Sequence, residues 1–126
     1  MMRRYRVFIL LLLGLSPLVL GQKSRVLSVI QLIESEKYSE AKESIELAVW
    51  NDRTSDWSRT YYAKGLLCQK AYEAGKEKND EKLFTLYPDQ LIVAYDAYEK
   101  ALDLNPGNRV IRAIAKNYYA LANDFQ

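Results

Sequence analysis

Two segments that lie far apart in the chain place small and large apolar residues at the same helical spacing. The residues are Tyr38, Ala41, Ile45 and Ala48 in one segment, and Leu91, Ala94, Tyr98 and Ala101 in the other. Steps of three, four and three residues put each set on one face of a helix. The alanines let a neighbouring helix approach closely, and the large residue between them fills the space that remains. The spacing therefore predicts packed pairs of helices.

The apolar periodicity of residues 22–126 predicts a series of helices. Their ranges are 24–35, 39–50, 57–78, about 88–104 and 109–125. Ser39 is expected to cap the second helix, and Ser55 or Asp56 the third. Pro106 ends the fourth, since proline disfavours helix at the residue before it. The chain has only 5 Gly and 3 Pro, too few for a turn-rich β protein, so the fold class is predicted to be all-α.

Residues 1–21 have the three-part layout of a secretory signal peptide. Three arginines precede an apolar run, and Gly21 is a small residue directly before a cut ahead of Gln22. An uncleaved anchor is the alternative, but a spanning helix needs about 20 apolar residues, and Gly14, Ser16 and Pro17 interrupt this run. We expect export to the periplasm or cell envelope of a Gram-negative bacterium, or secretion, with membrane contact only through an uncleaved signal.

Loss of this leader changes the electrostatic character of the chain. The formal net charge falls from +2 to about −1, because the leader carries arginines and no acidic residue. A nucleic-acid-binding domain needs a basic patch or stripe, which the remaining sequence does not offer. We therefore expect no nucleic-acid partner.

The sequence supplies few groups for catalysis. It contains no His, which removes the commonest general base and metal ligand. Its single cysteine, Cys68, lies in an apolar helical segment and is expected to be buried and inert. No glycine-rich phosphate-binding motif is present, and carboxylate pairs such as Asp80 and Glu81 lie in polar segments. We therefore expect no enzyme activity, no catalytic residue, no cofactor and no metal site.

The helical pairs resemble the tetratricopeptide repeat (TPR), a helical hairpin of about 34 residues. The segment AYDAYEKALDLNP matches the second helix of that repeat through Ala94, Tyr98, Ala101 and Pro106. The segment SEKYSEAKESIELAVW is similar to the same helix, but Arg53 stands where the closing proline is usual. The resemblance implies an α-solenoid in an exported bacterial TPR protein.

A first helix of the repeat is also recognisable. The segment YYAKGLLCQKAY resembles it, with Tyr61 and Gly65 at the aromatic and glycine positions and departures at Lys64 and Cys68. The resemblance divides the chain into a first repeat at 22–55, a second at 56–108, and the first helix of an incomplete third at 109–126. This makes about two and a half hairpins.

The second repeat is longer than the family pattern by about 17 residues, between Gly65 and Ala94. We expect an extended first helix and then a loop that packs back on the hairpin. The packing residues would be Leu83, Phe84, Leu86 and Tyr87. The alternative is that this insertion forms a lip that binds a partner.

The resemblance also implies that the first helix of each hairpin lines a concave binding surface. The candidate partner-binding residues are Arg59, Tyr62, Leu66, Gln69, Lys70 and Asn117. Further groove-facing positions would be Val26, Ile30, Ile33, Val110, Ala113 and Leu121. Such a groove would suit an extended or helical peptide. The alternative is that Tyr62 and Leu66 only pack between hairpins.

Residues 110–122 are apolar around most of the expected helix, whereas a terminal repeat helix should have a polar outer face. Two explanations follow: the chain is the front part of a longer repeat protein, or it self-associates through residues 109–126. The functional expectation is a non-enzymatic interaction scaffold that binds a protein or peptide partner. The alternative is a structural subunit that self-associates through its apolar C-terminal helix.

Overall fold

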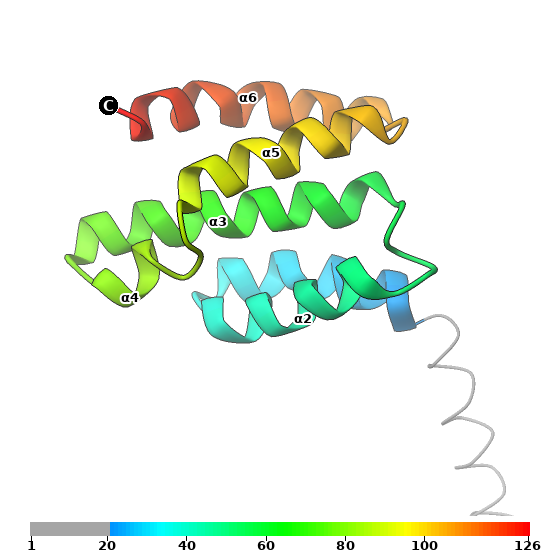
Figure 1. Ribbon diagram of the computed structural model, residues 1–126, viewed down its shortest axis with the longest axis horizontal. Coiled ribbons are helices and arrows are strands. Elements are labelled where there is room, and N and C mark those ends of the chain that lie inside the picture. Colours follow the sequence, from blue (N-terminus) through cyan, green and yellow to red (C-terminus); the bar gives the residue numbers. More distant parts are fainter. Residues whose placement is uncertain (1–20) are drawn as a thin grey trace, which may run out of the picture.

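The computed structural model describes residues 21–126, and every regular element in that range is a helix. The first helix, whose described part covers residues 21–34, is followed by α2 (Tyr38–Trp50), α3 (Ser58–Lys78), α4 (Glu81–Phe84), α5 (Gln90–Asp103) and α6 (Asn108–Asp124) (Figure 1). The all-α prediction is confirmed. The predicted signal peptide lies outside the described residues apart from Gly21. Within 21–126, no helix has both the length and the apolarity that a membrane crossing requires.

The expected cap at Ser39 is wrong. α2 begins at Tyr38, and its N-cap is Lys37, which makes no side-chain capping bond. The reason is a tight link from the first helix. Glu36 adopts a positive φ of 59°, and the backbone N–H of Lys37 donates to the carbonyl of Leu32 at 2.8 Å. This closure ends one helix and leaves room for the next to start before Ser39.

The caps expected at the start of α3 are also wrong. α3 begins at Ser58, and its N-cap is Trp57 in an extended conformation, so neither Ser55 nor Asp56 takes this position. The preceding loop is held instead by Thr54, whose hydroxyl donates to the carbonyl of Ala48 at 2.6 Å. This buried bond fixes the end of α2 and the path of the chain into α3.

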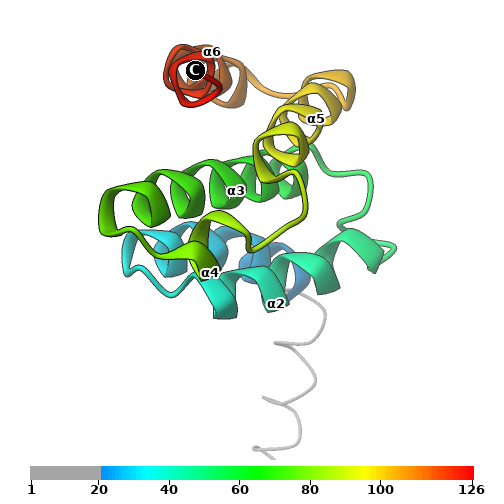
Figure 2. The same cartoon turned by 60° about the vertical axis from the view of Figure 1, so that its left-hand side comes forward.

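α3 is the central helix and contacts α2, α4, α5 and α6. The first helix and α2 lie on one side of it, and α5 and α6 lie on the other (Figure 2). The first helix, α3 and α6 all begin at the same end of the molecule and run in one direction, whereas α2 and α5 run back (Figure 1). The longer helices therefore form antiparallel hairpins, with α6 added alongside the second.

The alternating small and large residues form the contact between helices, as their spacing predicts. Ala41, Ile45 and Ala48 of α2 are fully buried, and so are Ala94, Tyr98 and Ala101 of α5. The second set meets α3 at Gly65, where an added Cβ would lie 2.5 Å from the Tyr98 ring. Glycine is thus needed for the close approach of α3 and α5.

The insertion between Gly65 and Ala94 packs against the helices, which confirms that prediction. α3 continues to Lys78, and Asn79 then takes a left-handed conformation that turns the chain into α4, a short helix that the sequence did not predict. Leu83 and Leu86 pack on the core, and the Phe84 ring lies edge-on to Tyr72.

Two polar side chains fasten this insertion. The amide of Gln90 donates to the carbonyls of Cys68 and Leu83 at 2.9 and 3.0 Å, and its oxygen accepts the N–H of Tyr87 at 2.9 Å. The hydroxyl of Tyr87 donates to Glu46 of α2 at 2.7 Å. The insertion is therefore anchored to both hairpins.

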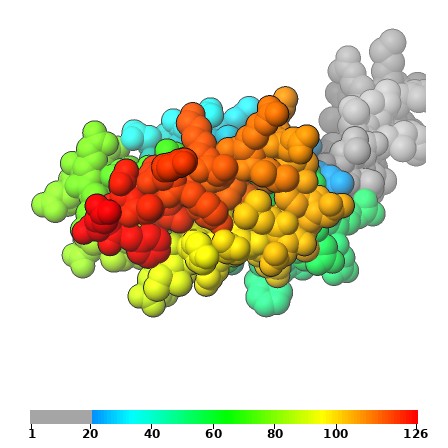
Figure 3. Space-filling model, turned by 90° about the horizontal axis from the view of Figure 1, so that it is seen from above, coloured from blue at the N-terminus to red at the C-terminus, as the bar shows by residue number. Residues whose placement is uncertain are grey.

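α6 has one buried side and one exposed apolar side. Val110, Ile114 and Leu121 are buried against α3 and α5, whereas Ile111 and Tyr119 face solvent, Tyr119 at 81% exposure. In the space-filling view, α6 covers the upper surface beside α5 (Figure 3). The apolar circumference seen in the sequence is therefore only half used by the packing within residues 21–126.

Candidate binding groove

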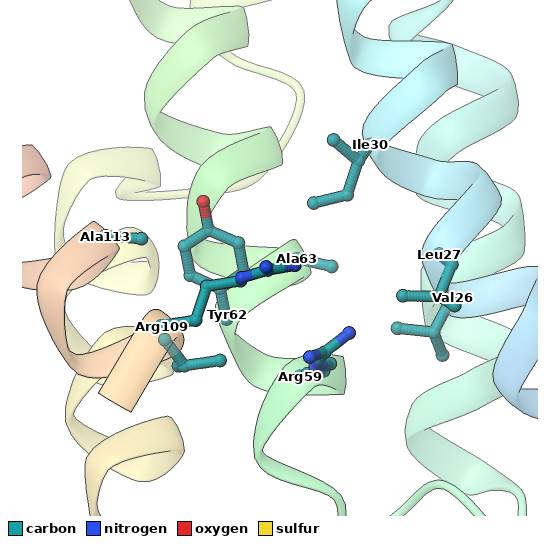
Figure 4. Close-up of a pocket in the computed structure, with 9 residues that line it drawn as sticks. Val26, Leu27, Ile30, Arg59, Tyr62, Ala63, Arg109 and Ala113 are labelled. Carbon is teal, nitrogen blue, oxygen red and sulfur yellow. The ribbon is translucent and has the colours of Figure 1, made fainter. Parts of the chain in front are cut away.

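Three parallel helices enclose a cavity of about 220 Å³. Its floor and walls are almost entirely apolar, and Figure 4 shows the side chains of the first helix, α3 and α6 turned toward it. The first helix contributes Val26, Leu27 and Ile30, α3 contributes Arg59, Tyr62 and Ala63, and α6 contributes Arg109, Val110 and Ala113. Segments far apart in the sequence therefore meet here because the first helix, α3 and α6 run in the same direction.

Tyr62 stands in the middle of this cavity, between the first helix and α6 (Figure 4). Its ring centroid lies 6.3 Å from that of Tyr98, and the side chain of Asn117 lies near its hydroxyl. Burial raises the pKa of Tyr62 above its ordinary value, so the hydroxyl is neutral at physiological pH. A neutral tyrosine, apolar over its ring and polar at one end, suits a contact surface for a peptide.

Arg59 and Arg109 line the same cavity and carry its positive charge. Neither forms an ion pair with any of residues 21–126. The Arg59 guanidinium lies 6.0 Å from the ring centroid of Trp57, which holds it near the cavity without neutralising it. Two arginines beside an apolar floor form a site that favours a negatively charged group.

A second cavity, of about 450 Å³, continues along the same side of α3. It shares Ile30 with the first cavity and adds Ile33 of the first helix and Leu66 of α3. Its charged residues are Glu34, Glu36, Lys70, Glu73 and Glu77. The two cavities form one trough, which we call the α3 trough, and its second half is acidic.

Some of the candidate partner-binding residues line the trough, and others are buried beneath it. Arg59, Tyr62, Leu66 and Lys70 line the α3 trough, with Leu66 almost completely buried in its floor. Gln69 is fully buried behind it. The amide side chain of Gln69 accepts from the Tyr98 hydroxyl at 2.6 Å and donates to the carbonyl of Asn117 at 3.2 Å.

Gln69 and Asn117 thus join three helices beneath the trough. The side-chain amide of Asn117 also donates to the Tyr98 hydroxyl at 3.4 Å, which completes a polar link between α3, α5 and α6. Gln69 and Asn117 therefore fix the relative positions of the helices that form the walls of the trough, whereas Tyr62 lines the cavity itself.

Several residues of the trough were missed by reasoning from sequence. Leu27, Ala63 and Arg109 line the first cavity, and Glu34 and Glu77 line the second. The stripe on α3 was available as a signal, because Arg59, Glu73 and Glu77 continue the steps of three and four residues through Tyr62, Leu66 and Lys70. Arg109 carried no such signal, since the register of α6 against α3 depends on tertiary packing.

A carboxyl pair ties the end of α6 to α3. The Oδ2 atom of Asp124 is buried and receives no hydrogen bond from an N–H or O–H group of the described residues, and the carboxyl group of Glu73 lies within hydrogen-bonding reach. Burial and the neighbouring Glu73 raise the pKa of Asp124 to about 7. Lys70 forms an ion pair with Glu73 at 3.3 Å. We therefore expect the two carboxyl groups to share a proton at the last turn of α6.

The one cysteine of the chain lies inside the helical core. Cys68 is buried, as expected, and burial raises the pKa of its thiol to about 12, which keeps it an unreactive thiol. No group of three or more potential metal ligands is found among the described residues. Comparisons with protein-family models, with curated proteins and with solved structures find no match to this chain.

Proposed function

We propose that the protein is a non-enzymatic interaction scaffold that binds a protein or peptide partner in the α3 trough. The observation that carries the proposal is the apolar cavity lined by Tyr62, Arg59 and Arg109, in which neither arginine has an ion-pair partner among residues 21–126. Exposed apolar surface with a few directed polar groups is characteristic of peptide-binding grooves.

The proposal includes a repeat architecture of the TPR type. The first helix with α2, and α3 with α5, form antiparallel hairpins that pack through alanines, and α6 would be the first helix of a third hairpin. The positions of Ala94, Tyr98 and Gly65 at the α3–α5 contact support this assignment. We also propose that residues 1–21 direct export, so that the trough would meet its partner in the periplasm, in the cell envelope or outside the cell.

Site-specific photo-crosslinking tests the binding surface. A photoreactive phenylalanine analogue replaces Tyr62 in one version of the protein and Trp50 in another, in cells or in envelope extract. Trp50 is the matched control because it is 83% exposed and lies on α2, away from the trough. We expect a discrete adduct with another protein at position 62 and not at 50. Equal labelling at both positions would contradict the proposal.

A second candidate function is self-association through the outer side of α5 and α6. The observation that favours it is that α5, α6 and the residue after α6 carry five exposed large apolar side chains: Ile92, Tyr95, Ile111, Tyr119 and Phe125. Exposed apolar surface of this kind is typical of interfaces. Analytical ultracentrifugation of the wild type and of Tyr119→Glu tests it. A dimer that the substitution converts to monomer supports self-association, and a monomer in both excludes it.

A further inference from the structure

The α3 trough is a single stripe along one helix. Its α3 residues run from Arg59 through Tyr62, Leu66, Lys70 and Glu73 to Glu77, in steps of three or four. Ile30 of the first helix lines both halves. The shared Ile30, and Tyr62 and Leu66 one turn apart on α3, place the two cavities end to end along the helix.

The length of the stripe sets the length of chain that fits. The distance from Arg59 to Glu77 is about five helical turns, or about 27 Å. An extended chain covers this distance with about eight residues, at about 3.3 Å each. The central residues of such a segment would lie over Ile30, Tyr62 and Leu66, which form the apolar middle of the stripe.

One end of the α3 trough is positive. Arg59 and Arg109 lie there without an acidic partner among the described residues. α3 begins at Ser58 and α6 begins at Asn108, so the N-termini of both helices lie at this same end. The partial positive charge of a helix N-terminus adds to that of the arginines.

The other end is negative. Four glutamates line it, and Lys78 and Lys70 neutralise only two of them, Glu36 at 2.7 Å and Glu73 at 3.3 Å. Glu34 and Glu77 form no ion pair with a described residue. α3 also ends at Lys78, close to this end, so its C-terminal partial negative charge has the same sign.

We propose that the α3 trough selects its occupant by charge order. The occupant is an extended segment of about eight residues with an acidic group at one end, aliphatic residues in the middle and a basic group at the other. The acidic group lies against Arg59 and Arg109, and the basic group lies against Glu34 and Glu77. This inference rests on the proposed function, because it specifies the partner of the same surface.

A peptide-display selection with random nonapeptides tests the proposal, because it needs no knowledge of the natural partner. Three proteins are used: the wild type, the double variant Arg59→Glu with Arg109→Glu, and the control Arg25→Glu with Arg112→Glu. Arg25 and Arg112 are exposed and do not line the trough, so the control has the same change in net charge. Circular dichroism and thermal unfolding confirm that all three are folded.

The wild type and the control are expected to enrich peptides with Asp or Glu at one end and Lys or Arg at the other. The Arg59 and Arg109 variant is expected to enrich peptides that are basic at both ends, and to bind the peptides selected by the wild type about tenfold or more weakly. The single variant Tyr62→Ala should not bind the peptides that the wild type selects.

The outcomes separate the two proposals. Selected peptides that lose binding with Tyr62→Ala but show no charge order would overturn the charge selection and leave the groove as a binding surface. Peptides whose affinity is unchanged by the Arg59 and Arg109 substitutions would also overturn the charge selection and leave the groove as a binding surface. Absence of any enriched peptide, or enrichment that is insensitive to Tyr62→Ala, would overturn both.

Discussion

Gly65 is the residue at which the close packing of α3 and α5 leaves least freedom. Any Cβ at this position meets the ring of Tyr98, which is fully buried and whose hydroxyl is fixed to Gln69. The ring cannot move aside without losing that hydrogen bond or displacing α5. The distance between α3 and α5 therefore depends on the absence of a Cβ atom at Gly65.

Gly65→Ala is expected to lower the free energy of unfolding by about 1–3 kcal/mol, because overpacking forces side chains and helices apart. Urea denaturation measures the change. Gly107→Ala is the matched control, since no atom lies within 4 Å of a Cβ added there. Equal stability of the Gly65 variant and the control would show that the α3–α5 contact is looser than described.

Asp124 gives the stability a dependence on pH. Its pKa is about 7 in the folded protein, against an ordinary value of 3.8, so between these values the folded state keeps a proton that the unfolded state has lost. The stabilisation is therefore complete below pH 3.8 and is lost as the pH rises through 7. Glu73, whose pKa is lowered, acts in the opposite direction only below its ordinary value of 4.5.

Unfolding at pH 5 and at pH 8 isolates this effect. The wild type is expected to be less stable at pH 8, because Asp124 then ionises beside Glu73. Asp124→Asn should reduce this loss, since an amide can donate to Glu73 at both pH values. If the wild type and Asp124→Asn show the same change in stability between the two pH values, the two carboxyl groups do not share a proton.

At the scale of elements, the insertion after α3 depends on one buried side chain. Gln90 joins the N–H of Tyr87 and the carbonyls of Cys68 and Leu83, so its removal leaves three backbone groups without these partners. The carbonyl of Leu83 still accepts from the N–H of Leu86, so the N–H of Tyr87 is the group that loses its printed partner, at a cost of about 1–3 kcal/mol when no water replaces it.

Gln90→Ala is expected to destabilise the protein by about 1–3 kcal/mol and to speed amide exchange in residues 79–89. Hydrogen-exchange mass spectrometry measures the second effect. Gln31→Ala, at an exposed position of the first helix, provides the control and should leave exchange in residues 79–89 unchanged. Unaltered protection of these residues in the Gln90 variant would mean that Tyr87 and Leu86 hold the insertion without it.

Sequence periodicity predicted the helices and their buried faces more accurately than their ends. Ala41, Ile45, Ala94 and Tyr98 were identified correctly because a helical face repeats every three or four residues. The caps failed because Ser39 is preceded by a tight turn at Glu36 that already starts the helix. The backbone bonds of this local turn, from Glu36 to Ile33 and from Lys37 to Leu32, therefore decide where α2 begins.

The lining of the trough could be predicted from the sequence only in part, because it is formed by residues of several helices. Positions along one helix, such as Arg59, Tyr62 and Leu66, were named from the resemblance to the repeat family, and helical spacing places them on one face. The meeting of Arg109 with Arg59, and of Asp124 with Glu73, depends on how far α6 slides along α3, which sequence spacing within a helix does not determine. Burial of Gln69 likewise follows from the position of Tyr98 on a different helix.

For the whole molecule, the parallel course of the first helix, α3 and α6 is the feature from which the proposed function follows. It places three helix faces along one trough and gives the trough two ends of opposite charge. The opposite side of the molecule, on α2, exposes Leu47 and Trp50 but forms none of the walls of these two cavities. A partner bound in the trough and a partner bound on α2 would therefore contact different sets of residues.

The most direct test is an NMR titration of the isotope-labelled protein with a display-selected peptide of acidic, aliphatic and basic order. The account predicts amide shift changes along residues 26–34, 59–77 and 109–117, with the acidic end of a spin-labelled peptide broadening signals near Arg59 and Arg109. Shift changes centred on Leu47 and Trp50 of α2, or on Ile92 and Tyr119 of the outer α5–α6 side, would contradict it.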